Sequence, residues 1–204
     1  MACYIFGAGD VTPLRSRPAS GDYVIAADGG WNACCAAQIV PDLLLGDFDS
    51  LGAVPDFAYV ERVPVEKDDT DMLLAIKRGF ALGHREFHLY GGMGGRRTDH
   101  TIANLQSLLY LAQRGAKGWL YGTGEIYTAI HNSAIVLPAR TQGTLSVFCL
   151  GADACGVTIE GAQYEVKDAV LTADFPLGVS NRFAGKEIKV SVEQGSLLLG
   201  LLEE

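Results

Sequence analysis

The most informative segment of the sequence is Leu43-Leu44-Leu45-Gly46-Asp47-Phe48-Asp49-Ser50. Its apolar half predicts a buried strand over 43–45, which breaks at a glycine into two carboxylates one residue apart. Alternation along an extended backbone would place Asp47 and Asp49 on one side. Two carboxylates that close repel each other unless a cation lies between them, and oxygen ligands of this kind suit Mg²⁺. An acidic turn is the alternative for this segment alone, because Asp, Gly and Ser are common turn residues.

Short apolar runs alternate with helical segments through the first half of the chain. Strands are expected over 2–6, 23–27, 43–45, 59–63, 86–90 and 118–121, and helices over 30–38, 70–82 and 99–114. Strands that alternate with helices predict an α/β domain, a mostly parallel, Rossmann-like sheet flanked by helices on both faces. The composition of residues 15–21 predicts a mobile loop.

The pattern changes after about Gly124, where short strand-like segments are separated by Gly, Pro, Asn and Asp. These segments are 134–137, 144–150, 156–159, 169–171, 187–192 and 196–201, with no helix among them. They predict a C-terminal antiparallel β-sandwich or small barrel. We therefore expect two domains, over 1–123 and 124–204.

Composition excludes several classes of protein. Of the 204 residues 49% are hydrophobic and 20% charged, as is usual for a globular protein. The net charge of −8 argues against nonspecific nucleic-acid binding, which needs Lys and Arg on phosphates. No apolar run reaches the roughly 18 residues of a membrane span, and no secretory leader is evident. The five cysteines lack C-x-x-C spacing and predict buried free thiols in a reducing, cytoplasmic compartment.

Polar motifs follow four of the predicted strands. In chain order they are Asp28-Gly29-Gly30, Asp47 with Asp49, Asp68-Asp69-Thr70-Asp71, and Gly91-Gly92-Met93-Gly94-Gly95-Arg96-Arg97. Ligands bind outside the carboxyl ends of the strands in an open α/β sheet, so these motifs are expected to share one crevice. Taken singly, the first could be a tight turn, and Asp69 or Thr70 could be a helix N-cap.

The glycine-rich run is typical of a loop that binds phosphates. Its backbone N–H groups and the N-terminus of the following helix favour anions. Arg96 and Arg97 add guanidinium groups, which can each donate two hydrogen bonds to a phosphate. It is neither a P-loop nor the Rossmann glycine fingerprint. His100 and Asn104 lie one turn apart on the next predicted helix, so both could face this loop, although a structural role is the alternative for His100.

In their order and spacing, these motifs resemble the thiamine pyrophosphokinase family. The matching segments are Ala27-Asp28-Gly29-Gly30, Gly46-Asp47-Phe48-Asp49-Ser50, Asp68-x-Thr70-Asp71, and Gly94-Gly95 with Arg97-x-Asp99-His100 and Ala103-Asn104. The second half is also similar to this family, in Gly156-Val157-Thr158-Ile159-x-Gly161-x-x-Tyr164 and Leu177-Gly178-Val179-Ser180-Asn181. The resemblance covers nearly the whole chain.

The resemblance implies an enzyme that transfers the pyrophosphoryl group of ATP to the hydroxyl of thiamine, giving thiamine diphosphate and AMP. It implies a Mg²⁺-dependent homodimer with shared active sites. Residues 1–123 would be the catalytic domain that binds ATP and Mg²⁺, and residues 124–204 the domain for thiamine binding and dimerisation.

The resemblance also assigns residues to roles. The metal ligands would be Asp28, Asp47, Asp49 and Asp71, of which Asp47, Asp49 and Asp71 would be catalytic. ATP would contact Asp28, Gly29, Gly94, Gly95, Arg97, Asp99 and His100. Thiamine would contact Thr70, Asp71, Ser180 and Asn181. Two departures from the family pattern leave open whether Arg96 or Arg97 binds phosphate, and how the thiamine pocket accommodates Arg182, which stands where many members have an acid.

Two other classes of protein stay open from the residues. A phosphohydrolase of the haloacid dehalogenase type also ends an apolar strand in Asp-x-Asp and uses the first carboxylate as a nucleophile. That pattern normally has Thr or Val two residues after the second acid, where this chain has Leu51. A non-catalytic module that senses Mg-nucleotide would use the same binding groups. The products formed from ATP and thiamine would distinguish these classes.

Overall fold

The structure is a computed structural model that describes residues 1–10, 13–48, 55–66, 68–95 and 97–203. The chain divides into two compact units. The first comprises Met1–Ser107 and Gly118–Thr123, and the second comprises Leu108–Lys117 and Gly124–Glu204.

The first unit is built on a largely parallel sheet, in the strand order β6-β5-β1-β2-β3-β4. The strands are β1 (Cys3–Phe6), β2 (Tyr23–Ala27), β3 (Leu43–Gly46), β4 (Val60–Arg62), β5 (Glu86–Tyr90) and β6 (Lys117–Gly122). Strand β1 pairs in parallel with β2 and β5, β2 with β3, and β3 with β4. The predicted α/β class and these strand positions are confirmed.

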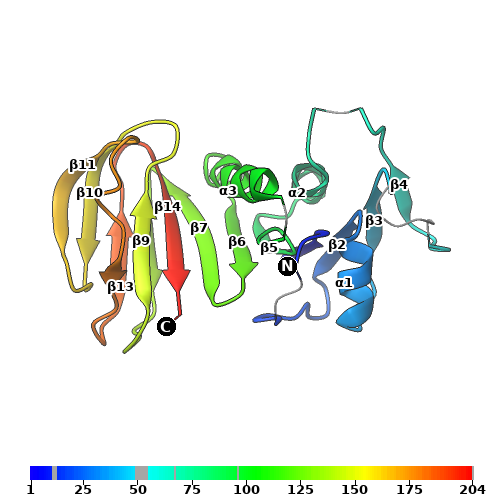
Figure 1. Ribbon diagram of the computed structural model, residues 1–204, viewed down its shortest axis with the longest axis horizontal. Coiled ribbons are helices and arrows are strands. Elements are labelled where there is room, and N and C mark those ends of the chain that lie inside the picture. Colours follow the sequence, from blue (N-terminus) through cyan, green and yellow to red (C-terminus); the bar gives the residue numbers. More distant parts are fainter. Residues whose placement is uncertain (11–12, 49–54, 67, 96, 204) are drawn as a thin grey trace. The chain divides into compact units, whose positions relative to one another are not determined.

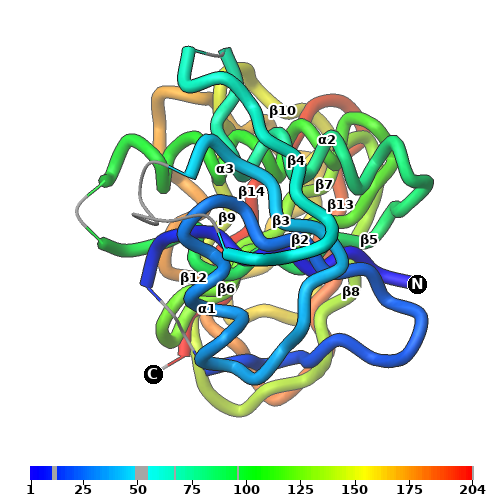
Figure 2. The backbone as a smooth tube through the Cα atoms, turned by 90° about the vertical axis from the view of Figure 1, so that its right-hand side faces the viewer, coloured from blue at the N-terminus to red at the C-terminus, as the bar shows by residue number. Residues whose placement is uncertain are grey.

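Helices cover both faces of this sheet. They are α1 (Gly30–Ala36), α2 (Asp71–Ala81) and α3 (Thr98–Ala112), close to the predicted ranges. Helices α1 and α2 lie on opposite sides of the sheet (Figures 1 and 2). Gly79 lets α2 approach closely, because an added Cβ would lie 2.8 Å from both Cys3 Sγ and Phe87 Cε1. This face is an apolar core, since Cys3, Ile5, Phe87 and Leu89 are fully buried.

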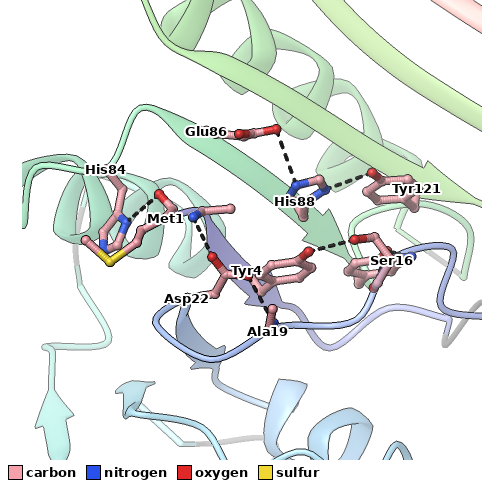
Figure 3. A network of polar contacts seen from close by, with 11 residues as sticks. Met1, Tyr4, Ser16, Ala19, Asp22, His84, Glu86, His88 and Tyr121 are labelled. Carbon is pink, nitrogen blue, oxygen red and sulfur yellow. Dashed lines mark hydrogen bonds and ion pairs between the residues drawn. The ribbon is translucent and has the colours of Figure 1, made fainter.

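The other face of strands β1, β5 and β6 carries stacked rings and a polar network (Figure 3). Tyr4 stacks on His88, and Tyr90 on Tyr121, each pair with ring centroids 4.5 Å apart. The loop predicted over 15–21 is tied to this face, because Ser16 Oγ lies 2.6 Å from the Tyr4 hydroxyl and Ser16 N donates to the Tyr90 hydroxyl. These contacts hold the loop around Ser16 against the sheet.

The second unit is an antiparallel β-sandwich, as predicted. Its strands are β7 (Glu125–His131), β8 (Ala134–Leu137), β9 (Thr144–Phe148), β10 (Ala154–Glu160), β11 (Val166–Leu171), β12 (Asn181–Arg182), β13 (Ile188–Ser191) and β14 (Ser196–Leu202). Within this unit the strand orders are β12-β9-β14-β7 and β11-β10-β13-β8. The Leu-rich β14 pairs with β7 and β9, and its Leu197 and Leu199 are fully buried.

Some sequence predictions about local structure are corrected. Strands β7 and β12 were not predicted, although the β-branched and aromatic residues of 126–130 are a strand signal. The prediction of buried cysteines is wrong for Cys35 and Cys155, which are exposed. Burial raises the pKa of the Cys3 and Cys34 thiols to about 12. No helix in the described ranges is long and apolar enough to span a membrane.

Candidate active site

A cavity of about 480 Å³ opens at the carboxyl ends of the parallel strands of the first unit. The loops after β1, β2, β3 and β5 all contribute to it, together with the first residues of α2 and α3. Of the predicted site residues, those that line it are Asp28, Asp47, Thr70, Asp71, Gly94, Gly95, Arg97 and His100. The structure thus brings the four polar motifs to one crevice.

Asp28 enters this cavity from the turn between β2 and α1. It is only 7% exposed, and its backbone takes a φ of 48°, which side-chain-bearing residues rarely adopt. Its N–H donates to Leu45 O at 2.8 Å, which ties the turn to β3. Gly29 is the N-cap of α1 and is absent from the cavity lining, so it acts on the site through this turn.

Asp47 is half-buried in the cavity, directly after β3. The expectation of an extended backbone through this segment is wrong, because β3 ends at Gly46 and Phe48 has a φ of 65°. The Phe48 ring is buried, with the Arg62 guanidinium 5.7 Å from its centroid. The turn therefore buries an aromatic side chain directly after the acid. Asp49 and Ser50 lie outside the described residues.

The acids around the start of α2 serve different purposes. Thr70 is the N-cap, and its Oγ1 accepts the Leu73 N–H at 3.2 Å. Asp71 lies in the first helical turn, where the helix dipole favours a negative charge, and its Oδ1 is shielded from solvent. Asp69 instead forms an ion pair with Lys77 at 2.6 Å and is absent from the cavity lining. Only Asp71 of this segment brings its charge to the cavity.

The glycine-rich loop is packed tightly against the loop that follows β1. Gly9 N–H donates to Gly91 O at 2.8 Å, and a Cβ on Gly91 would overlap Gly7 O. On the other side, the buried Asn104 donates from Nδ2 to Gly92 O at 2.7 Å. Asn104 therefore ties α3 to this loop and faces the cavity together with His100.

Arg97 lines the cavity while its guanidinium is held by Asp99. Nε and Nη2 of Arg97 donate to the Asp99 carboxylate, the shorter bond being 2.7 Å. Hydrogen bonds from Arg97 lower the pKa of Asp99 to about 2, so Asp99 stays ionised at any working pH. Asp99 itself is absent from the cavity lining, which makes it a group that orients Arg97. Arg96 lies outside the described residues.

One acid that lines the cavity was not predicted from the sequence. Asp10 follows β1 in the segment Gly7-Ala8-Gly9-Asp10, and all four residues line the cavity. The signal was available, since small residues followed by an acid after a predicted strand repeat the pattern of the other motifs. Met72 and Thr101 also line the cavity without having been predicted.

The predicted thiamine contacts of the second unit lie at the end of an exposed segment. Ser180 is exposed, has a φ of 65°, and donates its N–H to Ser146 Oγ at 3.1 Å. Asn181 is 7% exposed, and its amide is engaged with the Tyr164 backbone at both ends, at 2.9 and 2.7 Å. In this arrangement Asn181 fixes the turn that presents Ser180.

The charge of the cavity suits a cation and a polyphosphate together. Asp10, Asp28, Asp47 and Asp71 supply carboxylates, and the glycine loop and Arg97 supply donors for anions. Within the described ranges no three acidic, histidine or cysteine side chains are grouped tightly enough to hold a metal ion alone. Mg²⁺ usually takes one or two carboxylates, with substrate phosphates and water, so this donor set fits it. Acidic side chains beside a glycine-rich loop, at the carboxyl edge of a parallel sheet, are typical of proteins that bind phosphorylated ligands.

Comparisons with known proteins identify the family. Residues 16–120 match the thiamin pyrophosphokinase catalytic domain, and residues 133–197 match the thiamin pyrophosphokinase vitamin B1 binding domain. The chain belongs to the thiamin pyrophosphokinase family. With both domains present, its activity is the transfer of the pyrophosphoryl group of ATP to thiamine, giving thiamine diphosphate and AMP.

Solved structures share the fold over the full chain. Thiamine pyrophosphokinase from Bacillus subtilis has a TM-score of 0.89 and 22% identity, with 100% of both chains covered. Thiamin pyrophosphokinase from Geobacillus thermodenitrificans has a TM-score of 0.86 and 24% identity, and the match covers 100% of this chain and 98% of that one. Thiamin pyrophosphokinase from Candida albicans has a TM-score of 0.81 and 13% identity, and the match covers 100% of this chain and 90% of that one. In a comparison with curated protein sequences, none matches this chain.

Proposed function

We propose that pyrophosphoryl transfer takes place in the acidic cavity of the first unit and depends on Mg²⁺. The observation that carries this proposal is that Asp28, Asp47 and Asp71, from three separate segments, line one cavity with a glycine-rich loop. These three carboxylates, with Asp49, would hold the metal. Bound there, Mg²⁺ would neutralise charge on the triphosphate, which is what phosphoryl transfer chiefly requires.

The remaining cavity residues have separate tasks in this proposal. The N–H groups of Gly94 and Gly95 and the Arg97 fork bind phosphate oxygens, and His100 lies beside them. Asp99 keeps the Arg97 guanidinium in place, and Gly29 holds the Asp28 turn. Asp71 orients the thiamine hydroxyl and accepts its proton as the hydroxyl oxygen bonds to the β-phosphorus of ATP. The bond between the β-phosphorus and the oxygen of AMP breaks, and AMP leaves. Thr70 positions Asp71 by capping α2.

We further propose a homodimer in which Ser180 and Asn181 of a second subunit complete the thiamine site. Three large apolar side chains precede Ser180 in an exposed segment, Phe175, Leu177 and Val179, with 64%, 58% and 40% of their surfaces exposed. Contiguous exposed apolar side chains are typical of an interface. The backbone beneath them is fixed, because Val147 N–H donates to Gly178 O at 2.8 Å.

The free cysteines support assignment to the cytoplasm.

Identification of the products tests the reaction. The protein is incubated with ATP, thiamine and Mg²⁺, and the products are separated by mass. AMP with thiamine diphosphate is the expected pair, and the yield falls to background in excess EDTA. ADP with thiamine monophosphate would exclude pyrophosphoryl transfer. Undiminished turnover in EDTA would exclude the metal.

Subunit mixing tests the shared site. Inactive Asp71→Asn and inactive Ser180→Ala subunits are mixed under conditions of proven exchange. Each mixed dimer should regain one site that has both residues, so a one-to-one mixture recovers about a quarter of wild-type activity, since half the dimers are mixed. A mixture as inactive as its parents would show that each subunit completes its own pocket.

A further inference from the structure

Asp10 lies where the glycine-rich loop would bind a phosphate. Its Oδ2 accepts the Gly95 N–H at 3.0 Å. The same oxygen lies 2.7 Å from the position that a Cβ on Gly94 would take, so the carboxylate rests against two successive glycines. Gly94 and Gly95 have φ values of 75° and 72°, so the carboxylate meets a backbone shape that other residues rarely adopt.

The approach of Asp10 follows from the sheet order. Strands β1 and β5 are parallel neighbours, so their following loops leave the same edge side by side. Gly7 N–H donates to Tyr90 O and Gly9 N–H to Gly91 O, both at 2.8 Å. These two bonds hold the β1 loop along the glycine loop and bring Asp10 to Gly95.

A carboxylate oxygen and a phosphate oxygen compete for the same N–H group, because both are anionic acceptors. The Gly95 N–H can serve a nucleotide phosphate only when Asp10 leaves it. Asp28, Asp47 and Asp71 line the same cavity, so an incoming polyphosphate also meets a negative field.

We propose that Asp10 is an internal competitor for the phosphate site and determines which polyphosphates enter it. It occupies the Gly95 N–H in the ligand-free protein and repels polyphosphates that carry no cation. The inference rests on the proposed function of the glycine loop as the phosphate site. The alternative to competition is a structural role, in which Asp10 holds the glycine loop in shape and so supports phosphate binding.

Three substitutions separate these roles. Asp10→Ala removes the charge and frees the Gly95 N–H. Asp10→Asn removes the charge but leaves an oxygen that can accept the same hydrogen bond. Asp56→Asn removes one charge from an exposed residue absent from the cavity lining and is the matched control. A fourth variant, Gly95→Ala, tests the site itself, because a φ of 72° strains any residue with a Cβ.

The experiment measures binding of inorganic tripolyphosphate in EDTA by calorimetry, up to about 10 mM ligand. Asp10→Ala should bind about tenfold more tightly than wild type, Asp10→Asn by a smaller factor, and Asp56→Asn like wild type. If Asp10→Ala binds tripolyphosphate as weakly as wild type or more weakly, or if no variant binds it, the proposal that Asp10 competes with phosphate is wrong. If Gly95→Ala binds as well as wild type, the glycine loop is not the phosphate site and the proposed function of that loop fails instead.

Discussion

Gly46 lies directly against Asp28, because a Cβ added to Gly46 would come within 3.0 Å of Asp28 Cα and 3.1 Å of its Cβ. The glycine therefore lets the turn after β2 rest on the end of β3. A hydrogen bond also joins these two segments, because the Asp28 N–H donates to Leu45 O at 2.8 Å. The position of one proposed metal ligand thus depends on the absence of a side chain on the neighbouring strand.

Gly46→Ala should displace Asp28 and lower kcat/KM about tenfold, or about 1.4 kcal/mol of transition-state stabilisation. The neighbouring atoms belong to backbone and to a buried residue, so they cannot move aside freely. Steady-state kinetics measures the loss, and circular dichroism verifies the fold. Wild-type kcat/KM in a folded Gly46→Ala protein would show that the placement of Asp28 is unimportant.

Asp71→Asn should abolish most activity and leave the melting temperature within about 4 °C of wild type. The lost attraction to the α2 dipole is offset by weaker repulsion from the other cavity acids. Asp69→Asn is the matched control, since Asp69 lies two residues away and pairs with Lys77. The control should keep its turnover, and equal losses in both variants would assign the effect to the helix start.

Asn104→Ala should raise the KM for ATP more than it lowers kcat, because it releases the glycine loop from α3. It leaves the Gly92 carbonyl without its donor, at a cost of about 1–3 kcal/mol in the free energy of unfolding. Ser107→Ala is the control on the same helix, where the buried hydroxyl donates to Ala103 O within α3. That variant should lose stability and keep its KM. An unchanged KM in Asn104→Ala would separate Asn104 from nucleotide binding.

The alternation of strands and helices was predictable because each element carries its own period. Helix α2 shows apolar residues three and four apart, and β3 is an unbroken apolar run. The crevice was predictable because loops after parallel strands converge at one edge. These inferences need only local sequence and one general rule of sheet geometry.

The contacts between loops were not predictable, because they depend on which strands are neighbours. Asp10 and Gly95 are far apart in the chain, and they meet because strand β1 lies beside strand β5. Phe48, whose ring is buried, has a φ of 65°, so the backbone here departs from the extended shape that alternation assumes. Asn181 matched a family motif, yet its hydrogen bonds with Tyr164 depend on tertiary structure.

We expect a buried histidine to make the stability of the first unit sensitive to acid. His88 stacks on Tyr4, its Nδ1 lies 2.8 Å from the Tyr121 hydroxyl, and its Nε2 lies 3.8 Å from Glu86 Oε1 (Figure 3). Burial lowers the pKa of His88, against smaller opposing effects of Glu86 and Asp22. Between this lowered pKa and the unfolded value near 6.5, the unfolded chain binds more protons than the folded one.

The free energy of unfolding should therefore be greatest above about pH 6.5 and should fall as the pH drops from there towards the folded pKa of His88, below which it levels off. Urea denaturation from about pH 5 to pH 8 measures this fall, and His88→Gln should flatten it, because Gln can still bond to the Tyr121 hydroxyl but carries no titrating group. The difference between variant and wild type cancels the contributions of the other histidines. Asp22, whose pKa is lowered from 3.8, acts only at more acidic pH. Parallel curves for the two proteins would show that His88 does not control the acid sensitivity.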